Sequence, residues 1–184
     1  MKELALHILD IAQNSITADA TLIEIEIREN TEENVLLISI RDNGCGMNLE
    51  LLEKVTDPFV TTRTTRKVGL GISLFKAAAE RCNGSLFIDS DLGKGTVLKV
   101  NFDRNHIDRA PLGNMADTMV TLIIAKDSIN YIYRHTLDKK EFELDTRRIR
   151  EILGEDVPLG ELTVLDWIKN YIIEGIRELT NNLQ

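Results

Sequence analysis

Two residues with oxygen-bearing side chains, Asp10 and Asn14, lie near the start of the chain. Both fall in residues 2–18, where apolar residues recur at helical spacing, so their side chains share one face of the expected helix. The Asn14 amide oxygen suits Mg²⁺, which takes hard oxygen ligands and shares them with phosphate and water. The Asp10 carboxylate could orient or deprotonate a nucleophile. The alternative is a polar helix stripe that faces solvent.

A carboxylate also ends a strand-like run in ISIRDNGCGM, residues 38–47. Side chains alternate along a strand, so Asp42 shares the face of apolar residues such as Ile40. An unpaired carboxylate between a sheet and its helices is costly. An adenine amino group would supply donors, whereas guanine presents an acceptor there. Gly44 and Gly46 have no Cβ and would let the backbone approach a flat base. The alternative is an ordinary Asp-Asn-Gly turn.

A pair of glycines, Gly69 and Gly71, opens a further predicted helix that begins near Ile72. The free N–H groups and the dipole of a helix N-terminus attract phosphate. Residues 63–67, which include Lys67, add positive charge just before the pair. The pair lacks the third glycine of the Rossmann fingerprint. The alternative is a glycine-containing helix start without a ligand.

Composition and charge narrow the class of protein. The chain has 184 residues, of which 43% are hydrophobic, and this suits one domain or one domain with a small annex. A net charge of −8 would repel nucleic acid and anionic lipid, so neither is an expected partner. No apolar run reaches transmembrane length and no secretory leader is evident. We therefore expect a cytoplasmic protein.

The spacing of apolar residues predicts the elements that position these side chains. The expected order is a helix, two strands, a short helix, a loop, a helix and two strands. Their ranges are 2–18, 21–29, 35–41, 48–55, 56–71, 72–83, 85–90 and 95–102. This order predicts an α+β fold in which a mixed, mostly antiparallel sheet is covered by helices on one face.

A polar linker and a second group of elements follow. The expected linker is 104–116, which contains Pro111 and Gly113. Beyond it we expect strands at 119–125, 129–135 and 141–145, and helices at 146–153 and 164–182, with Asp145 as the cap of the first helix. We expect 1–103 and 117–184 to be two domains, the second a small α/β domain.

The last predicted helix carries an apolar stripe. Its members are Leu162, Leu165, Ile168, Ile172, Ile176 and Leu179. We expect the stripe to pack on the strands of the tail itself. The alternative is that part of it docks a partner or a second copy of the chain, which would form a homodimer. His106 and His135 are expected at the surface.

Four segments together resemble the GHKL ATPase superfamily, which has the Bergerat nucleotide-binding fold. They are DIAQNSITADAT, RDNGCGM, DPFVTTR…KVGLGISL and GKGT, and they occur in the order of that superfamily over residues 1–103. The first part looks most like the mismatch-repair ATPases and the second most like the ATP-binding domain of histidine kinases. The resemblance implies that ATP and Mg²⁺ are the ligands. The C-terminal extension, residues 117–184, resembles no family.

The resemblance also implies a role for each matching residue. Asn14 would coordinate Mg²⁺, and Asp42 would bind the adenine amino group with help from Thr96. The residues that would line the base pocket are Gly44, Gly46 and Met47. Phe59 would pack at the hinge of a lid formed by residues 60–68, which contains Thr61 and Thr62. The residues that would contact the phosphates are Lys67, Gly69, Leu70 and Gly71.

One departure from the superfamily pattern bears on catalysis. Family members often carry Glu where this chain has Asp10, which is one methylene shorter. Because a displacement of about 1 Å can cost about 100-fold in rate, we expect slow hydrolysis. No phosphoacceptor-histidine segment precedes the matching region, so a complete sensor kinase is not expected.

Three functions are compatible with these features. The first is a kinase-like enzyme that passes the γ-phosphoryl group of Mg-ATP to a separate regulatory protein. The second is an ATP-gated switch or binding module with slow or no hydrolysis. The third is a mismatch-repair-type clamp, which would need nucleotide-dependent dimerisation.

Overall fold

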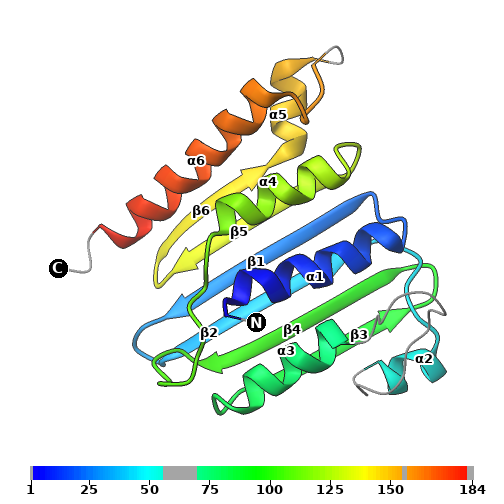
Figure 1. Ribbon diagram of the computed structural model, residues 1–184, viewed down its shortest axis with the longest axis vertical. Coiled ribbons are helices and arrows are strands. Elements are labelled where there is room, and N and C mark those ends of the chain that lie inside the picture. Colours follow the sequence, from blue (N-terminus) through cyan, green and yellow to red (C-terminus); the bar gives the residue numbers. More distant parts are fainter. Residues whose placement is uncertain (1, 56–69, 155–156, 182–184) are drawn as a thin grey trace.

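The main feature of the molecule is a six-stranded mixed sheet (Figure 1). The computed structural model describes residues 2–55, 70–154 and 157–181. The strands are β1 (Leu22–Asn30), β2 (Val35–Asp42), β3 (Ser85–Asp91), β4 (Gly95–Asp103), β5 (Asn130–Leu137) and β6 (Lys140–Asp145). Their order across the sheet is β3-β4-β2-β1-β5-β6. Strands β1 and β5 run parallel, and the other neighbours run antiparallel.

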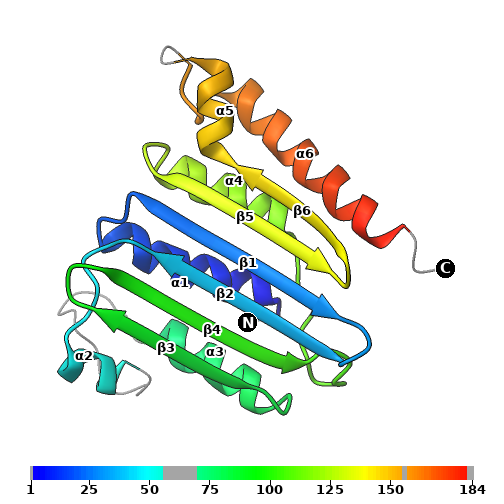
Figure 2. The ribbon, with the colours of Figure 1, turned by 180° about the vertical axis from the view of Figure 1, so that it is seen from behind.

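Helices cover one face of this sheet. The helices are α1 (Leu4–Thr17), α2 (Leu49–Lys54), α3 (Leu70–Glu80), α4 (Met115–Ala125), α5 (Thr146–Leu153) and α6 (Leu162–Thr180). Seen from behind, the sheet lies in front and α1, α3 and α4 lie beyond it (Figure 2). The predicted fold class, a mostly antiparallel mixed sheet with helices on one face, is confirmed.

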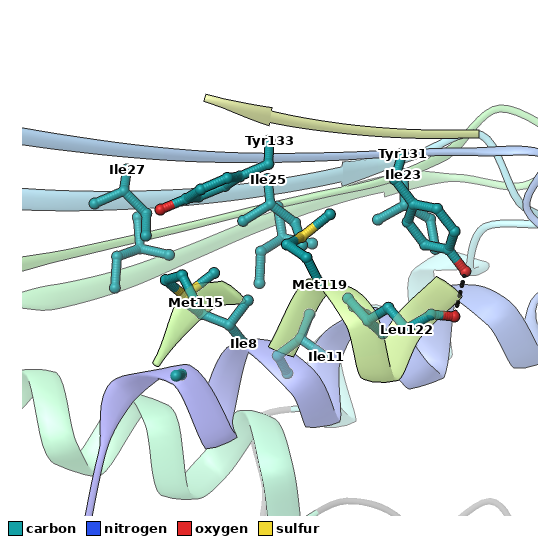
Figure 3. Close-up of a cluster of buried hydrophobic side chains, with 14 of the residues drawn as sticks. Ile8, Ile11, Ile23, Ile25, Ile27, Met115, Met119, Leu122, Tyr131 and Tyr133 are labelled. Carbon is teal, nitrogen blue, oxygen red and sulfur yellow. Dashed lines mark hydrogen bonds between the residues drawn. The ribbon is translucent and has the colours of Figure 1, made fainter. Parts of the chain in front are cut away.

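Alternating side chains explain why the sheet buries one face. In β1, Ile23, Ile25 and Ile27 are buried, whereas Glu24 and Glu26 between them are partly exposed. The buried isoleucines meet Ile8 and Ile11 of α1 and the methionines of α4 (Figure 3). A strand with period-two patterning can bury only one face. The alternation therefore fixes which face receives the helices.

The prediction of a strand at 119–125 is wrong, because this run lies in helix α4. Asn114 caps the helix, and its side chain accepts a hydrogen bond from Asp117 N. The apolar run is nearly continuous because α4 packs between α1 and α6 and buries side chains on both sides. A short buried helix and a buried strand cannot be told apart by periodicity in such a run.

The C-terminal extension continues the first sheet. Strand β5 pairs with β1 along its whole length, and β6 pairs with β5. Tyr131 and Tyr133 of β5 point into the layer between sheet and helices (Figure 3), where the Tyr131 hydroxyl donates to the carbonyl of Leu122 in α4 at 2.9 Å. The division into domains at 104–116 stays a prediction, but the two segments share one sheet and one core.

The segment before α4 forms backbone hydrogen bonds with the start of the first helix. The backbone N–H of Leu4 donates to Pro111 O at 2.9 Å, and that of Ala5 donates to Leu112 O at 2.7 Å. The first N–H groups of a helix have no partner within the helix itself. Residues 111–112 therefore complete the N-terminus of α1, the helix that carries Asp10 and Asn14.

The expectation that His135 lies at the surface is wrong, because this side chain is buried in a polar network. Its Nδ1 lies 2.9 Å from the Tyr133 hydroxyl, and its Nε2 lies 3.1 Å from a Glu29 carboxylate oxygen. Arg104 Nε donates to the other Glu29 oxygen at 2.9 Å. The contact with His135 is the largest cause of the lowered pKa of Glu29. Because a carboxylate only accepts, His135 Nε2 donates to Glu29.

Helix α6 packs on the extension's own strands, as predicted. It contacts β5, β6 and α4, and the predicted stripe is buried except for Leu162, which is 79% exposed, and Ile176, which is partly buried. Asp145 caps α5 as expected, because its side chain accepts from Arg147 N. Within the described residues, no helix combines the length and the apolar character that crossing a membrane requires.

Candidate nucleotide-binding site

Three polar side chains form a row across the helix-covered face at one end of the sheet. Asp42 of β2 lies directly opposite Thr96 of β4, and Thr96 lies opposite Ser90 of β3. The hydroxyls of Ser90 and Thr96 are 2.9 Å apart. This polar row, Asp42–Thr96–Ser90, lies at the edge of the apolar inner face that the same strands form. The structure thus brings two predicted site residues, Asp42 and Thr96, together.

The Asp42 carboxylate already has two protein partners. The Ser15 hydroxyl donates to Asp42 Oδ2 at 2.6 Å, and the Gly44 N–H donates to Oδ1 at 2.9 Å. The carboxylate therefore does not depend on a ligand for its partners. Each carboxylate oxygen has more than one lone pair, however, and Asp42 is only partly buried. The side chain is held in place and can still accept a hydrogen bond from a ligand.

The glycines after Asp42 are explained by close approaches within the protein. A Cβ on Gly44 would lie 2.6 Å from the carbonyl oxygen of Ala18. Gly46 has φ +64°, and a Cβ there would overlap the carbonyl oxygen of Asp91. Either contact requires glycine whether or not a ligand is bound. The role predicted for these glycines, close approach to a base, stays a prediction.

Ser90 forms a hydrogen bond with the segment that contains Met47. The Met47 N–H donates to Ser90 Oγ at 2.9 Å, and Ser90 Oγ lies 2.9 Å from Gly95 O. Ser90 is buried, so one side chain joins the β3–β4 turn to the segment after β2. Our sequence reasoning missed both Ser90 and Ser15. Ser90 could have been found because it shares the inner face of its strand with Ile88. Ser15 could have been found because it directly follows the candidate ligand Asn14.

Asp10 lies on α1 where this helix faces the start of α3, and Asn14 lies one turn further along α1. A Cβ on Gly71, in the first turn of α3, would lie 3.4 Å from the Asp10 Cβ, an ordinary van der Waals distance, so the two residues are neighbours. Both Asp10 and Asn14 are partly buried. Burial raises the pKa of the Asp10 carboxyl, which strengthens this group as a base. The structure thus brings together two predicted residues, Asp10 and Gly71.

His7, one turn before Asp10 on α1, has a structural role. The imidazole is buried and stacks on Phe75 of α3, with ring centroids 4.8 Å apart. Burial and two nearby positive charges lower the pKa of His7 to about 4, so the ring is neutral at pH 7. Its Nδ1 has no hydrogen-bond partner among the described residues.

Several predicted site residues lie outside the described residues. They are Phe59, Thr61, Thr62, Lys67 and Gly69, together with the rest of the predicted lid at 60–68. Leu70 is the first residue of α3 in the described chain. The predicted roles of these residues in the lid and at the phosphates stay predictions.

The described residues provide few protein ligands for a metal ion. They contain no cluster of three or more His, Cys, Asp or Glu side chains that could hold a metal by itself. Asn14 offers an oxygen ligand on the same face of α1 as Asp10, which lies next to the start of α3. This donor set fits Mg²⁺, which protein sites usually bind through one or two side chains together with substrate phosphates and water.

Comparison with known proteins identifies the fold and the family. Residues 2–106 match the family described as histidine kinase-, DNA gyrase B- and HSP90-like ATPases. Two solved structures are similar in fold. The N-terminal domain of a DNA repair protein has a TM-score of 0.57 and 17% identity, over 84% of this chain and 58% of that chain. The Aquifex aeolicus MutL ATPase domain complexed with ADP has a TM-score of 0.51 and 13% identity, and the match covers 100% of this chain and 99% of that chain.

Curated relatives match the first part of the chain. Sensor kinase CckA of Brucella abortus is 32% identical over 93 residues, which are 50% of this chain and 10% of that protein. Sporulation kinase E of Bacillus subtilis is 33% identical over 94 residues, 50% of this chain and 12% of that protein. The chain therefore spans only a small part of the length of these relatives.

Proposed function

Because the chain belongs to the ATP-binding family of histidine kinase-, DNA gyrase B- and HSP90-like ATPases, we propose that it binds Mg-ATP beside Asp42 and passes the γ-phosphoryl group to a separate regulatory protein. The observation that carries the proposal is the position of Asp42. Its carboxylate is fixed by Ser15 and Gly44, lies opposite Thr96, and keeps acceptor capacity for an adenine amino group.

The phosphates would extend from the base toward α1 and the start of α3. Asn14 would hold Mg²⁺, which neutralises charge on the phosphate oxygens when bound. The N–H groups at the start of α3 would face the phosphates. Asp10 is close enough to Gly71 in this region to orient the attacking group. In the transfer, the bond between the γ-phosphorus and the bridging oxygen breaks, ADP leaves, and the phosphoryl group joins the acceptor side chain.

The kinase proposal is supported by the relatives and tested by following the γ-phosphate. Two of the similar proteins bear the names of kinases. The purified chain would be incubated with γ-labelled ATP and Mg²⁺, alone and with a protein extract of the source cell, next to the Asp42→Asn variant. We expect label on a protein with the wild type and little with the variant. Bound ATP without any labelled protein would contradict phosphoryl transfer.

A second candidate, an ATP-gated switch, is favoured by the way the extension joins the site. Helix α1, which carries Asp10 and Asn14, packs on α4 of the extension and is capped by residues 111–112. A ligand that alters the position of α1 would therefore act on the extension as well. The switch requires a partner whose affinity differs with and without ATP, because a ligand shifts only the states it binds differently. Equal affinity would exclude it.

A further inference from the structure

We propose that Ser15 positions the Asp42 carboxylate and thereby sharpens the selection of adenine over purines that lack its amino group. This inference rests on the proposed function, because it requires a nucleotide base beside Asp42. Ser15 belongs to α1 and Asp42 to the end of β2, so their contact joins the helix layer to the sheet at the site.

The geometry directs the Ser15 hydroxyl toward Asp42. Ser15 is 3% exposed, so water does not compete freely for its hydroxyl. A serine within a helix commonly donates to the carbonyl four residues earlier. Here that carbonyl, Ile11 O, lies 3.5 Å away, whereas Asp42 Oδ2 lies at 2.6 Å. The shorter, charge-assisted contact is the stronger of the two.

Ser15 and Gly44 together fix both oxygens of the carboxylate. The Gly44 N–H donates to Oδ1 at 2.9 Å while Ser15 occupies one acceptor position of Oδ2. The remaining lone pairs then point in set directions. A base that donates to Asp42 gains more from a carboxylate that is already oriented than from one that must stop rotating on binding. Ser15 therefore acts on the base through Asp42, as a positioning residue.

The test compares ATP with purine riboside triphosphate, which has the same phosphates and ring but no amino group. Affinities would be measured by calorimetric titration for the wild type and for Ser15→Ala. If Ser15 acts through Asp42 on the amino group, Ser15→Ala should weaken ATP about tenfold and the analogue less than about twofold. A purely structural disturbance of α1 would weaken both ligands by the same factor.

Two further variants separate positioning from folding. Ser15→Thr keeps the hydroxyl and should retain most of the preference for ATP. Thr17→Ala removes a hydroxyl from the same helix that donates to Gln13 O, at an exposed position, and should change neither affinity. Circular dichroism and thermal unfolding would confirm that each variant is folded before titration.

The outcomes distinguish this inference from the proposed function. An equal loss for both ligands in Ser15→Ala, or equal wild-type affinity for ATP and the analogue, would overturn the inference and leave ATP binding intact. A wild-type protein that binds neither triphosphate would overturn the proposed function as well. Selective loss of ATP in Ser15→Ala, with the preference kept in Ser15→Thr, would support the inference.

Discussion

Two polar clusters interrupt the apolar layer of this protein, and they differ in the charge of the groups that meet their carboxylates. In the cluster of Glu29, His135 and Tyr133, each ring nitrogen of His135 has a partner and both Glu29 oxygens are engaged. In the polar row, each Asp42 oxygen also has one protein donor, but the donors are the neutral Ser15 hydroxyl and Gly44 N–H. The Glu29 cluster, in which a guanidinium balances the carboxylate, holds the extension to the sheet. The charge of Asp42 is left to attract the donor group of a ligand.

The largest expected effect comes from removing the extension. A chain of residues 1–106 would leave β1 without its parallel partner β5 and α1 without the side chains of α4. We expect this fragment to lack a cooperative unfolding transition in urea, followed by circular dichroism, while the full chain shows one. A fragment as stable as the full chain would show that the two predicted domains are independent.

The second prediction uses the two buried histidines, which differ in how their ring nitrogens are paired. Unlike His135, His7 has an unpaired Nδ1 among the described residues, and its pKa is lowered from 6.5 to about 4. The unfolded chain therefore binds a proton that the folded chain does not. The free energy of unfolding should fall by about 3 kcal/mol from this group between pH 7 and pH 4.

The His7 prediction is checked with a variant that keeps the stacked ring. His7→Phe preserves an aromatic contact with Phe75 and has no titrating nitrogen. Urea unfolding at a series of pH values should show a smaller loss of stability for His7→Phe than for the wild type between pH 6.5 and pH 4. The same slope in both proteins would mean that His7 is not the titrating group.

The third prediction concerns the polar row. Asp42→Asn replaces an acceptor-only carboxylate with an amide that cannot offer the same pair of acceptors, so ATP affinity should fall by about 1–3 kcal/mol. The fold should survive, because the amide oxygen can still accept from the Gly44 N–H while the amide NH2 group donates to the Ser15 hydroxyl oxygen. Asp89→Asn, at an exposed position on β3, is the matched control and should bind ATP normally. Unchanged affinity in Asp42→Asn would contradict the assignment of the base site.

The smallest expected effect lies in the Glu29 cluster. Glu29→Gln removes the charge that His135 and Arg104 contact, and should lower the free energy of unfolding by about 1–2 kcal/mol at pH 7 without changing ATP affinity. Because the folded pKa of Glu29 lies below its usual 4.5, this contribution is present above pH 4.5 and is lost as pH falls through the lowered pKa.

The Glu29 difference should therefore shrink in acid. Urea unfolding of Glu29→Gln and wild type at pH 7 and in the acid range measures it directly, with Glu33→Gln, at an exposed position nearby, as the control. A reduced ATP affinity in Glu29→Gln would mean that the two clusters are not separate in function.

The sequence predicted the parts of the fold in which local pattern and burial agree. The alternation in β1 and β2 identified the buried face and placed Asp42 on it. Helix α4 was misassigned because burial on both sides removed the periodicity that marks a helix. His135 was misplaced because its partners, Glu29 and Arg104, are distant in the chain and no local pattern reports them.

The candidate site shows the same limit. The residue types at Asp10, Asn14 and Asp42 were informative without any knowledge of contacts. The hydroxyl that holds Asp42 was not, because Ser15 lies 27 residues away in sequence and meets it only through the packing of α1 on the sheet. The glycine requirements at Gly44 and Gly46 likewise arise from backbone carbonyls elsewhere in the chain.

The most direct test is a titration of the ¹⁵N-labelled protein with Mg-ATP, followed by NMR. It reports in one experiment which of the two polar clusters meets the ligand. We expect large shifts for the amides of Ser15, Asp42 and Gly71 and small ones for Glu29 and His135. Large shifts around His135, with none around Asp42, would contradict ATP binding beside Asp42.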